Sequence, residues 1–128
     1  MKFYIASGLQ NKETVQQVSM VLCEKGHHHT YDWTKNDNAD SFEKLSIIGE
    51  AEKKGVQEAD VLIALLPGGK GTHIEIGIAI GMNKPVYIYT EFRINDPLSS
   101  CTFYHIEGVT MISDNINELL IKVEEEVV

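Results

Sequence analysis

The feature that most constrains the fold is the uninterrupted apolar run Val-Leu-Ile-Ala-Leu-Leu at residues 61–66. A run of this length without polar alternation is typical of a strand that is buried on both faces of a parallel sheet. A glycine-rich loop at residues 67–72 follows at once, and a helical pattern begins at residue 73. The sequence therefore predicts a central parallel strand that leads directly into a helix.

Strand-like and helical segments alternate along the rest of the chain. Strands are expected at residues 2–6, 27–31, 85–89 and 109–112, and helices at residues 11–26, 40–58 and 73–83, with a last helix from a cap at Ser113 or Asp114 to about residue 127. This alternation predicts an α/β fold with a doubly wound, five-stranded parallel sheet, a flavodoxin- or Rossmann-like three-layer sandwich. With no repeat and no linker, residues 1–128 are expected to form a single domain.

Such sheets bind ligands beyond the carboxyl ends of their strands, where the strand order reverses. The loops at residues 7–11, 32–37 and 67–72 are expected to meet there. Asp32 and Trp33 belong to the second loop and are candidate binding residues, because an aromatic side chain at a pocket edge can stack on a planar base.

The third loop and its helix read Pro-Gly-Gly-Lys-Gly-Thr-His-Ile-Glu at residues 67–75. Glycines let the backbone approach a ligand closely, and amides at a helix start bind anions. The residues expected to cradle a ligand are Gly68, Gly69, Lys70, Gly71 and Thr72. A flexible turn without a ligand is the alternative.

Glu75 has two interpretations. The spacing Thr72-x-x-Glu75 fits a capping box, in which the glutamate bonds back to the N-cap amide. Alternatively, the helix start keeps the carboxylate ionised and aims it into the cleft as a nucleophile.

Glu52 lies in an unexpected position for a carboxylate. On the helix expected at residues 40–58 it shares the stripe predicted to face inward, formed by Phe42, Leu45, Ile48 and Val56. A carboxylate there must be paired, protonated or functional, unless the helix phase is wrong by one residue. Tyr4, in the first strand, is either a core residue with a hydrated hydroxyl or part of the cleft.

Composition excludes several classes of function. A net charge of −8 disfavours binding to long nucleic acid. No apolar run approaches the roughly 18 residues that span a membrane, and the strand-like residues 3–6 stand where a secretory leader would begin, so we expect a cytoplasmic protein.

No metal and no cofactor are expected. His27, His28 and His29 are neighbours on a predicted strand, so their side chains alternate between its faces and do not converge on one ion. Cys23 and Cys101 match no metal-binding spacing.

Taken together, several segments resemble the nucleoside 2-deoxyribosyltransferase family, which includes 2′-deoxynucleoside 5′-phosphate N-hydrolases. The resemblance covers roughly residues 2–90. It rests on the first strand, on Ala-Asp before the apolar run, on the glycine loop, on Glu-Ile-Gly-Ile-Ala at residues 75–79, and on Gly-Met-Asn-Lys-Pro at residues 81–85.

The resemblance implies three catalytic roles. Glu75 matches the glutamate that attacks the anomeric carbon and forms a glycosyl-enzyme intermediate, and Tyr4 matches a tyrosine that orients it. Glu52 matches an acidic residue that contacts the base or assists its protonation; the family usually has aspartate there, so this chain departs from the pattern. The implied substrates are nucleosides or nucleotides.

The substrate's 5′ group and the assembly can also be addressed. Nucleoside transferases of the family tend to carry an acidic residue six positions before the glutamate, whereas this chain has Gly69 there, beside Lys70. This predicts 5′-monophosphate substrates, with Ser7 as a further donor.

The helix at residues 73–83 is apolar on more than one side, which predicts a homodimer or larger homo-oligomer. The resemblance implies that a partner completes the pocket, with Ser99 and Ser100 near the 5′ group.

Other functions remain open at this stage. The motif at residues 67–75 also resembles that of nucleoside 5′-monophosphate phosphoribohydrolases of the Pro-Gly-Gly-x-Gly-Thr type. A non-catalytic nucleotide-binding sensor is a second alternative, and an unrelated α/β hydrolase or structural partner is a third. Release of free base from a nucleotide separates an enzyme from a sensor.

Overall fold

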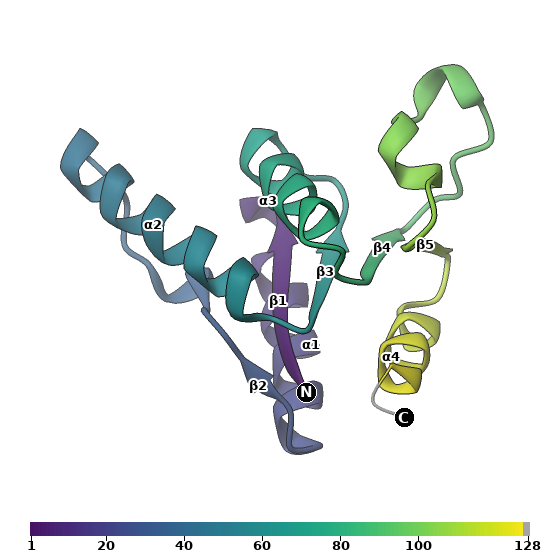
Figure 1. Ribbon diagram of the computed structural model, residues 1–128, viewed down its shortest axis with the longest axis horizontal. Coiled ribbons are helices and arrows are strands. Elements are labelled where there is room, and N and C mark those ends of the chain that lie inside the picture. The colour runs from purple at the N-terminus through teal and green to yellow at the C-terminus, as the bar shows by residue number, and fades with distance from the viewer. Residues whose placement is uncertain (127–128) are drawn as a thin grey trace.

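The computed structural model describes residues 1–126 and contains one five-stranded parallel sheet in the order β2-β1-β3-β4-β5 (Figure 1). The strands are β1 (Lys2–Ser7), β2 (His28–His29), β3 (Val61–Leu65), β4 (Val86–Thr90) and β5 (Val109–Ser113). The helices are α1 (Lys12–Glu24), α2 (Phe42–Glu58), α3 (Lys70–Gly81) and α4 (Ile116–Glu125). The predicted doubly wound α/β fold is confirmed.

Helices cover both faces of the sheet because strand side chains alternate between them. Phe3 and Ile5 of β1 pack on the face covered by α1 and α4. Tyr4 and Ala6 point to the other face, where they share a core with residues of α2 and α3 such as Val56. The apolar run of β3 is buried over its whole length, as its composition predicts.

The switch in strand order lies between β1 and β3. After β1 the chain crosses to β2 on one side, and later returns to place β3 on the other side of β1. In the β1–β3 register, Tyr4 lies opposite Leu62 and Ser7 opposite Leu65. The loops that follow β1 and β3 therefore leave the sheet side by side, at the edge where such folds bind ligands.

The prediction that Phe42 and Leu45 face inward is wrong. Phe42 is 91% exposed and Leu45 is 53% exposed, whereas Gly55 and Val56 near the other end of α2 are buried. Figure 1 shows the reason, since the first turns of α2 extend beyond the sheet and only its last turns pack on it. Helical spacing correctly groups these residues on one side, but that side lacks a partner within residues 1–126 over its first turns.

Several predicted boundaries also move. α3 begins at Lys70, three residues before the expected start, and β2 has only two residues. The last helix is capped by Asn115, whose side chain accepts from the amide of Asn117, and not by Ser113 or Asp114. Asp114 adopts a positive φ of 73° between β5 and the cap. The expected end of this helix near residue 127 lies outside the described residues.

The three consecutive histidines have different neighbours. His27 Nε2 lies 2.9 Å from Glu124 Oε1 of α4, and His29 Nδ1 lies 2.9 Å from Ser19 Oγ of α1. Across residues 1–126, no group of three or more histidine, cysteine or acidic side chains is arranged to hold a metal ion. In the same residues, no helix has the length and apolar character needed to cross a membrane.

Candidate functional site

A cavity of about 250 Å³ opens at the carboxyl edge of the sheet, where the loops after β1 and β3 meet α2 and α3. Its lining comes from all three loops that the sequence places at this edge. The residues are Ser7, Gly8, Leu9, Trp33, Glu52, Gly69, Gly71, Thr72 and Glu75. Two carboxyl groups thus face one small space beside a helix N-terminus.

Tyr4 of β1 holds the carboxylate of Glu75 in place through a hydrogen bond. The hydroxyl of Tyr4, which is fully buried on β1, donates a hydrogen bond to Oε2 of Glu75. Glu75 is itself only 7% exposed, although it lines the cavity. The capping-box interpretation is wrong, because the N-cap of α3 is Gly69 and no side chain caps that helix start. Glu75 therefore lies more than one turn inside the helix, with its carboxylate bonded to the sheet.

Glu52 reaches the cavity from α2 and is half-buried. Burial raises the pKa of its carboxyl, an effect that hydrogen bonding with Glu75 and Tyr4 partly offsets. Glu52 shares its side of the helix with the buried Val56, as the predicted stripe requires.

Burial also raises the pKa of Glu75 above that of an ordinary glutamate. The hydrogen bond from Tyr4 opposes this shift, and the nearby charge of Glu52 adds to it. Two carboxyls that share a poorly solvated site cannot both ionise at little cost, so the pair retains a proton to higher pH than isolated carboxyls do. The site can thus present one carboxylate and one carboxylic acid together.

The glycine loop forms one wall of the cavity. Gly69 is the N-cap of α3 and Gly71 lies in its first turn, and a side-chain carbon added to either one would enter open space. Gly68 instead packs against Thr72, whose side-chain atoms would lie 2.5–2.6 Å from an added carbon. Lys70 is exposed at the first position of the helix, outside the cavity lining. The open glycines leave room beside the free amides of the helix start.

Ser7 and Asn11 join the two loops that border the cavity. The hydroxyl of Ser7 donates to the carbonyl of Leu65 at 2.6 Å, and its oxygen accepts from Asn11 Nδ2 at 3.0 Å. Asn11 Nδ2 also lies 3.0 Å from the carbonyl of Pro67. Since the hydroxyl hydrogen of Ser7 is already used, Ser7 meets a ligand through its oxygen unless this bond is broken.

Trp33 borders the cavity from the short 3₁₀ helix η2 (Trp33–Lys35). Its indole Nε1 donates to the carbonyl of Ile5 on β1 at 2.7 Å. Asp32 caps η2 by accepting from the amide and hydroxyl of Thr34, at 3.0 and 2.5 Å. Asp32 therefore holds Trp33 in place and does not itself line the cavity.

Ser99 and Ser100 do not line the cavity that contains Glu52 and Glu75. Ser99, in the 3₁₀ helix η3 (Pro97–Ser99), lines a neighbouring cavity with His73 and Tyr104. Ser100 bonds to His105 Nε2 at 2.7 Å. The segment between β4 and β5 that carries both serines projects from the body of the fold in Figure 1.

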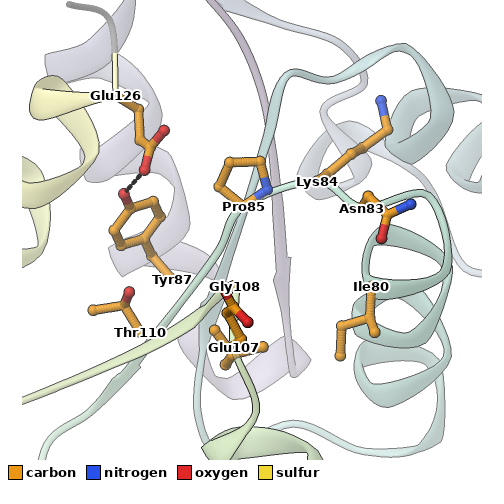
Figure 2. A pocket seen from close by; sticks show the side chains of 10 residues that line it. Ile80, Asn83, Lys84, Pro85, Tyr87, Glu107, Gly108, Thr110 and Glu126 are labelled. Atoms are coloured by element: carbon orange, nitrogen blue, oxygen red, sulfur yellow. Dashed lines mark hydrogen bonds between the residues drawn. The ribbon is translucent and has the colours of Figure 1, made fainter.

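Figure 2 shows a larger cavity, of about 430 Å³, at the opposite edge of the sheet. Most of its lining residues lie just before β4 and β5 or at the start of these strands, and the hydrogen bond from Tyr87 to Glu126 closes one side. It lies at the amino ends of the strands, away from the carboxyl pair, so the smaller cavity is the better candidate site.

The sequence profile of the nucleoside 2-deoxyribosyltransferase family matches residues 3–114. The chain belongs to this family. The match extends well beyond residues 67–75, the only part that resembles the phosphoribohydrolase motif. A comparison with curated protein sequences gives no match.

Two solved structures share the fold of this family member. One is a Clostridium botulinum CMP N-glycosidase, BcmB, with a TM-score of 0.68, 23% identity, and 97% of this chain and 99% of that chain covered. The other is a 2-deoxyribosyltransferase from Bacillus psychrosaccharolyticus, with a TM-score of 0.68, 19% identity, and coverages of 93% and 90%. At 23% and 19% identity, these two likenesses show a shared fold, and the family membership rests on the match over residues 3–114.

Three residues near the site were not singled out from the family resemblance or from the residue pattern. Gly8 and Leu9 line the cavity, and Asn11 ties its two loops together. All three belong to the loop at residues 7–11, which the sequence places at this edge because the loop follows the first strand. The signal was therefore the loop as a whole, because a glycine, a leucine and an asparagine carry no distinctive chemistry on their own.

Proposed function

We propose that this family member cleaves the N-glycosidic bond of deoxynucleosides or their 5′-monophosphates, with Glu75 as the nucleophile. The observation that carries the proposal is the buried hydrogen bond from Tyr4 to Glu75 at the floor of a cavity shared with Glu52. A carboxylate fixed by the sheet, with a second carboxyl beside it, is the arrangement that a retaining glycosidase uses.

In the first step an oxygen of Glu75 attacks C1′ as the C1′–N bond breaks. Positive charge develops at C1′, and a nearby carboxylate stabilises it before bonding to it. The hydrogen bond from the Tyr4 hydroxyl stabilises negative charge on the Glu75 carboxylate and fixes the rotamer of the Glu75 side chain. The electron pair of the broken bond leaves with the base.

Glu52 supplies the proton that the departing base needs. The positive charge at C1′ and the bond from Tyr4 both favour an ionised Glu75, so the proton shared by the pair resides on Glu52 during attack. A general acid of this kind contributes about 10²–10⁴ in rate. In the second step a water molecule or another base attacks C1′ and gives its proton to Glu52, now a carboxylate. The bond between Glu75 and C1′ breaks at the same time, and its electron pair returns to the Glu75 carboxylate.

We propose further that 5′-monophosphates are preferred over nucleosides. Gly69 stands where nucleoside transferases of the family tend to carry an acid, and it borders open space beside the helix N-terminus. Lys70 adds a positive charge at the rim, and the distant surface charge of the chain is screened over about 8–10 Å in physiological salt. The test is the ratio of kcat/KM for a deoxynucleoside 5′-monophosphate and its parent nucleoside, and a ratio below one contradicts the proposal.

A homo-oligomer is the proposed assembly. On α3, Ile76 is buried in the core, whereas Ile74 on another side is 63% exposed. Ile74 borders an apolar hollow of about 540 Å³ together with Phe103 and Cys101. A second copy that covers this hollow would remove it from water and bring another segment near the site. Sedimentation at micromolar concentration tests this proposal, and a monomer contradicts it.

The activity itself is tested by incubating the purified chain with a panel of nucleosides and 5′-monophosphates, with and without an acceptor base. Chromatography should show release of free base, and a new nucleoside or nucleotide if transfer occurs. The matched control is Glu75→Gln, which keeps an oxygen that can accept from Tyr4 and should lose about a thousandfold or more in kcat. Tight nucleotide binding without base release would instead indicate a sensor.

A further inference from the structure

The last turns of α2 contact β1 through a glycine. A Cβ added to Gly55 would lie 3.1 Å from both Cδ2 and Cε2 of the Tyr4 ring, and 2.8 Å from Cβ of Tyr31. Carbon atoms pack at about 3.5–4.0 Å, so an added methyl group does not fit unless something moves. The bare backbone of Gly55 is therefore what allows α2 to lie this close to Tyr31 and to the ring of Tyr4.

This end of α2 is also fastened to its surroundings. Thr30 donates from its hydroxyl to the carbonyl of Gly55 at 2.7 Å and from its amide to the carbonyl of Phe3 at 3.0 Å. Lys84 Nζ donates to the carbonyls of Gln57, at 2.7 Å, and Ala59. These bonds use carbonyls that the end of a helix leaves free, and they limit how far α2 can shift to make room.

Glu52 lies three residues before Gly55, and residues at this spacing are neighbours on one face of a helix. The contact that seats α2 on Tyr4 is therefore one turn from the carboxyl that faces Glu75. A change in the height of α2 above the sheet moves Glu52 relative to Glu75 and presses on the ring of Tyr4.

We propose that Gly55 is a positioning residue, which sets the distance of Glu52 from the Tyr4–Glu75 pair by letting α2 contact the Tyr4 ring directly. Its effect on turnover rests on the proposed function. Its effect on the carboxyl pair is a property of the folded protein without substrate, and is testable without any activity.

The direction of the effect follows from the groups that act on Glu75. These are Tyr4 from β1 and Glu52 from α2, while Tyr31 acts on Tyr4. The charge of Glu52 raises the pKa of Glu75. If a methyl group at position 55 lifts α2, that charge moves away, the pKa of Glu75 falls, and the acid limb of kcat/KM moves to lower pH.

The experiment compares Gly55→Ala with Gly49→Ala, a matched control at an exposed glycine of the same helix where an added Cβ meets nothing within 4 Å. For Gly55→Ala we expect kcat to fall about 10- to 100-fold, the scale for misplacing a reacting group by about 1 Å, with a smaller change in KM. In the free protein, a ¹³C NMR titration of the glutamate side chains should show the two carboxyls less coupled. Gly49→Ala should match the unchanged chain in every readout.

Two results overturn the inference: a folded Gly55→Ala protein with unchanged carboxyl titration, or a Gly49→Ala protein that reproduces the change. If Gly55→Ala fails to fold, Thr30→Val replaces it, because it removes the hydroxyl that ties the carbonyl of Gly55 to the segment after β2. An unchanged titration in that variant then contradicts the proposal. A chain that turns over no substrate but shows the expected titration sinks the proposed function and leaves the role of Gly55 standing.

Discussion

The hydroxyl of Tyr4 on β1 donates a hydrogen bond to the carboxylate of Glu75 on α3, joining two residues that are 71 positions apart in the chain. The bond crosses the interface between the sheet and a helix, so the core that places β1 against α3 also aims the carboxylate. A substitution that removes only this hydrogen bond is therefore expected to change the protonation of Glu75 and to leave the packing of β1 against α3 intact.

Tyr4→Phe removes the donated hydrogen while keeping the ring in the core. Bonds to charged groups contribute about 1.5–3 kcal/mol, so activity should fall by about 10- to 100-fold. The bond from Tyr4 lowers the pKa of Glu75, so its loss should move the acid limb of kcat/KM to higher pH. The control is Tyr31→Phe, whose hydroxyl donates to Asn36 at 2.8 Å. An unshifted acid limb in Tyr4→Phe would count against the assigned role.

Glu52→Gln should shift the same limb in the opposite direction, because removing the charge of Glu52 lowers the pKa of Glu75. For ordinary bases, kcat should fall by about 10²–10⁴ through loss of the general acid. The loss should be much smaller with 7-methyl-2′-deoxyguanosine 5′-monophosphate, whose base departs without protonation. An equal loss on both substrates would show that Glu52 does not protonate the base.

Gly71→Ala should affect stability and activity with opposite signs. Alanine is the better helix former by up to about 1 kcal/mol, and the added methyl group enters open space, so thermal unfolding should occur at the same or a higher temperature. The same methyl group projects beside the cavity and should lower kcat/KM. Gly49→Ala serves as the control for helix propensity alone. Full activity in Gly71→Ala would mean that the substrate does not approach this wall.

His29 should make the fold less stable in acid. Burial lowers the pKa of its imidazole, as do Lys35 and His28, while Asp32 opposes the shift. In the unfolded chain His29 binds a proton near pH 6.5, whereas in the folded protein it does so only at lower pH. The free energy of unfolding therefore decreases as the pH falls below about 6.5. His29→Phe keeps the stacking on Phe3 and removes Nε2, which is buried without a hydrogen-bond partner in the described residues. Denaturant unfolding at several pH values should show a weaker dependence in this variant, and an unchanged dependence would contradict the assignment.

The sequence predicts the sheet well because its signal is local. The run at residues 61–66 needs cover on both faces wherever it lies, and the alternation of segments then leaves few topologies. Helical spacing likewise predicts which residues share a side of α2. It does not reveal where the sheet ends beneath that helix, and for this reason Phe42 and Leu45 are exposed although they belong to the stripe expected to face inward.

The site is predictable in part. Glu52 draws attention because a carboxylate on the apolar stripe of a helix needs an explanation, and Glu75 because it follows the glycine loop near a helix start. The resemblance to a family connects both residues to Tyr4. Whether Thr72 and Glu75 can form a capping box depends on where α3 begins. Because α3 begins at Lys70, three residues before the expected start, its N-cap is Gly69 and not Thr72. Gly55 carries no chemical signal of its own, because its importance comes from a contact distance between α2 and β1 that only the folded chain defines.

The central claim is that Glu75 bonds covalently to C1′. Its most direct test is the mass of the intact protein after incubation with a 2′-fluorinated deoxynucleoside 5′-monophosphate that carries a good leaving base, since the fluorine slows breakdown of a glycosyl-enzyme. We expect a mass increase equal to the fluorinated sugar phosphate, located on the peptide that contains Glu75 and absent from Glu75→Gln. Release of the base by a protein whose Glu75 remains unmodified, or an adduct on another residue, would contradict it.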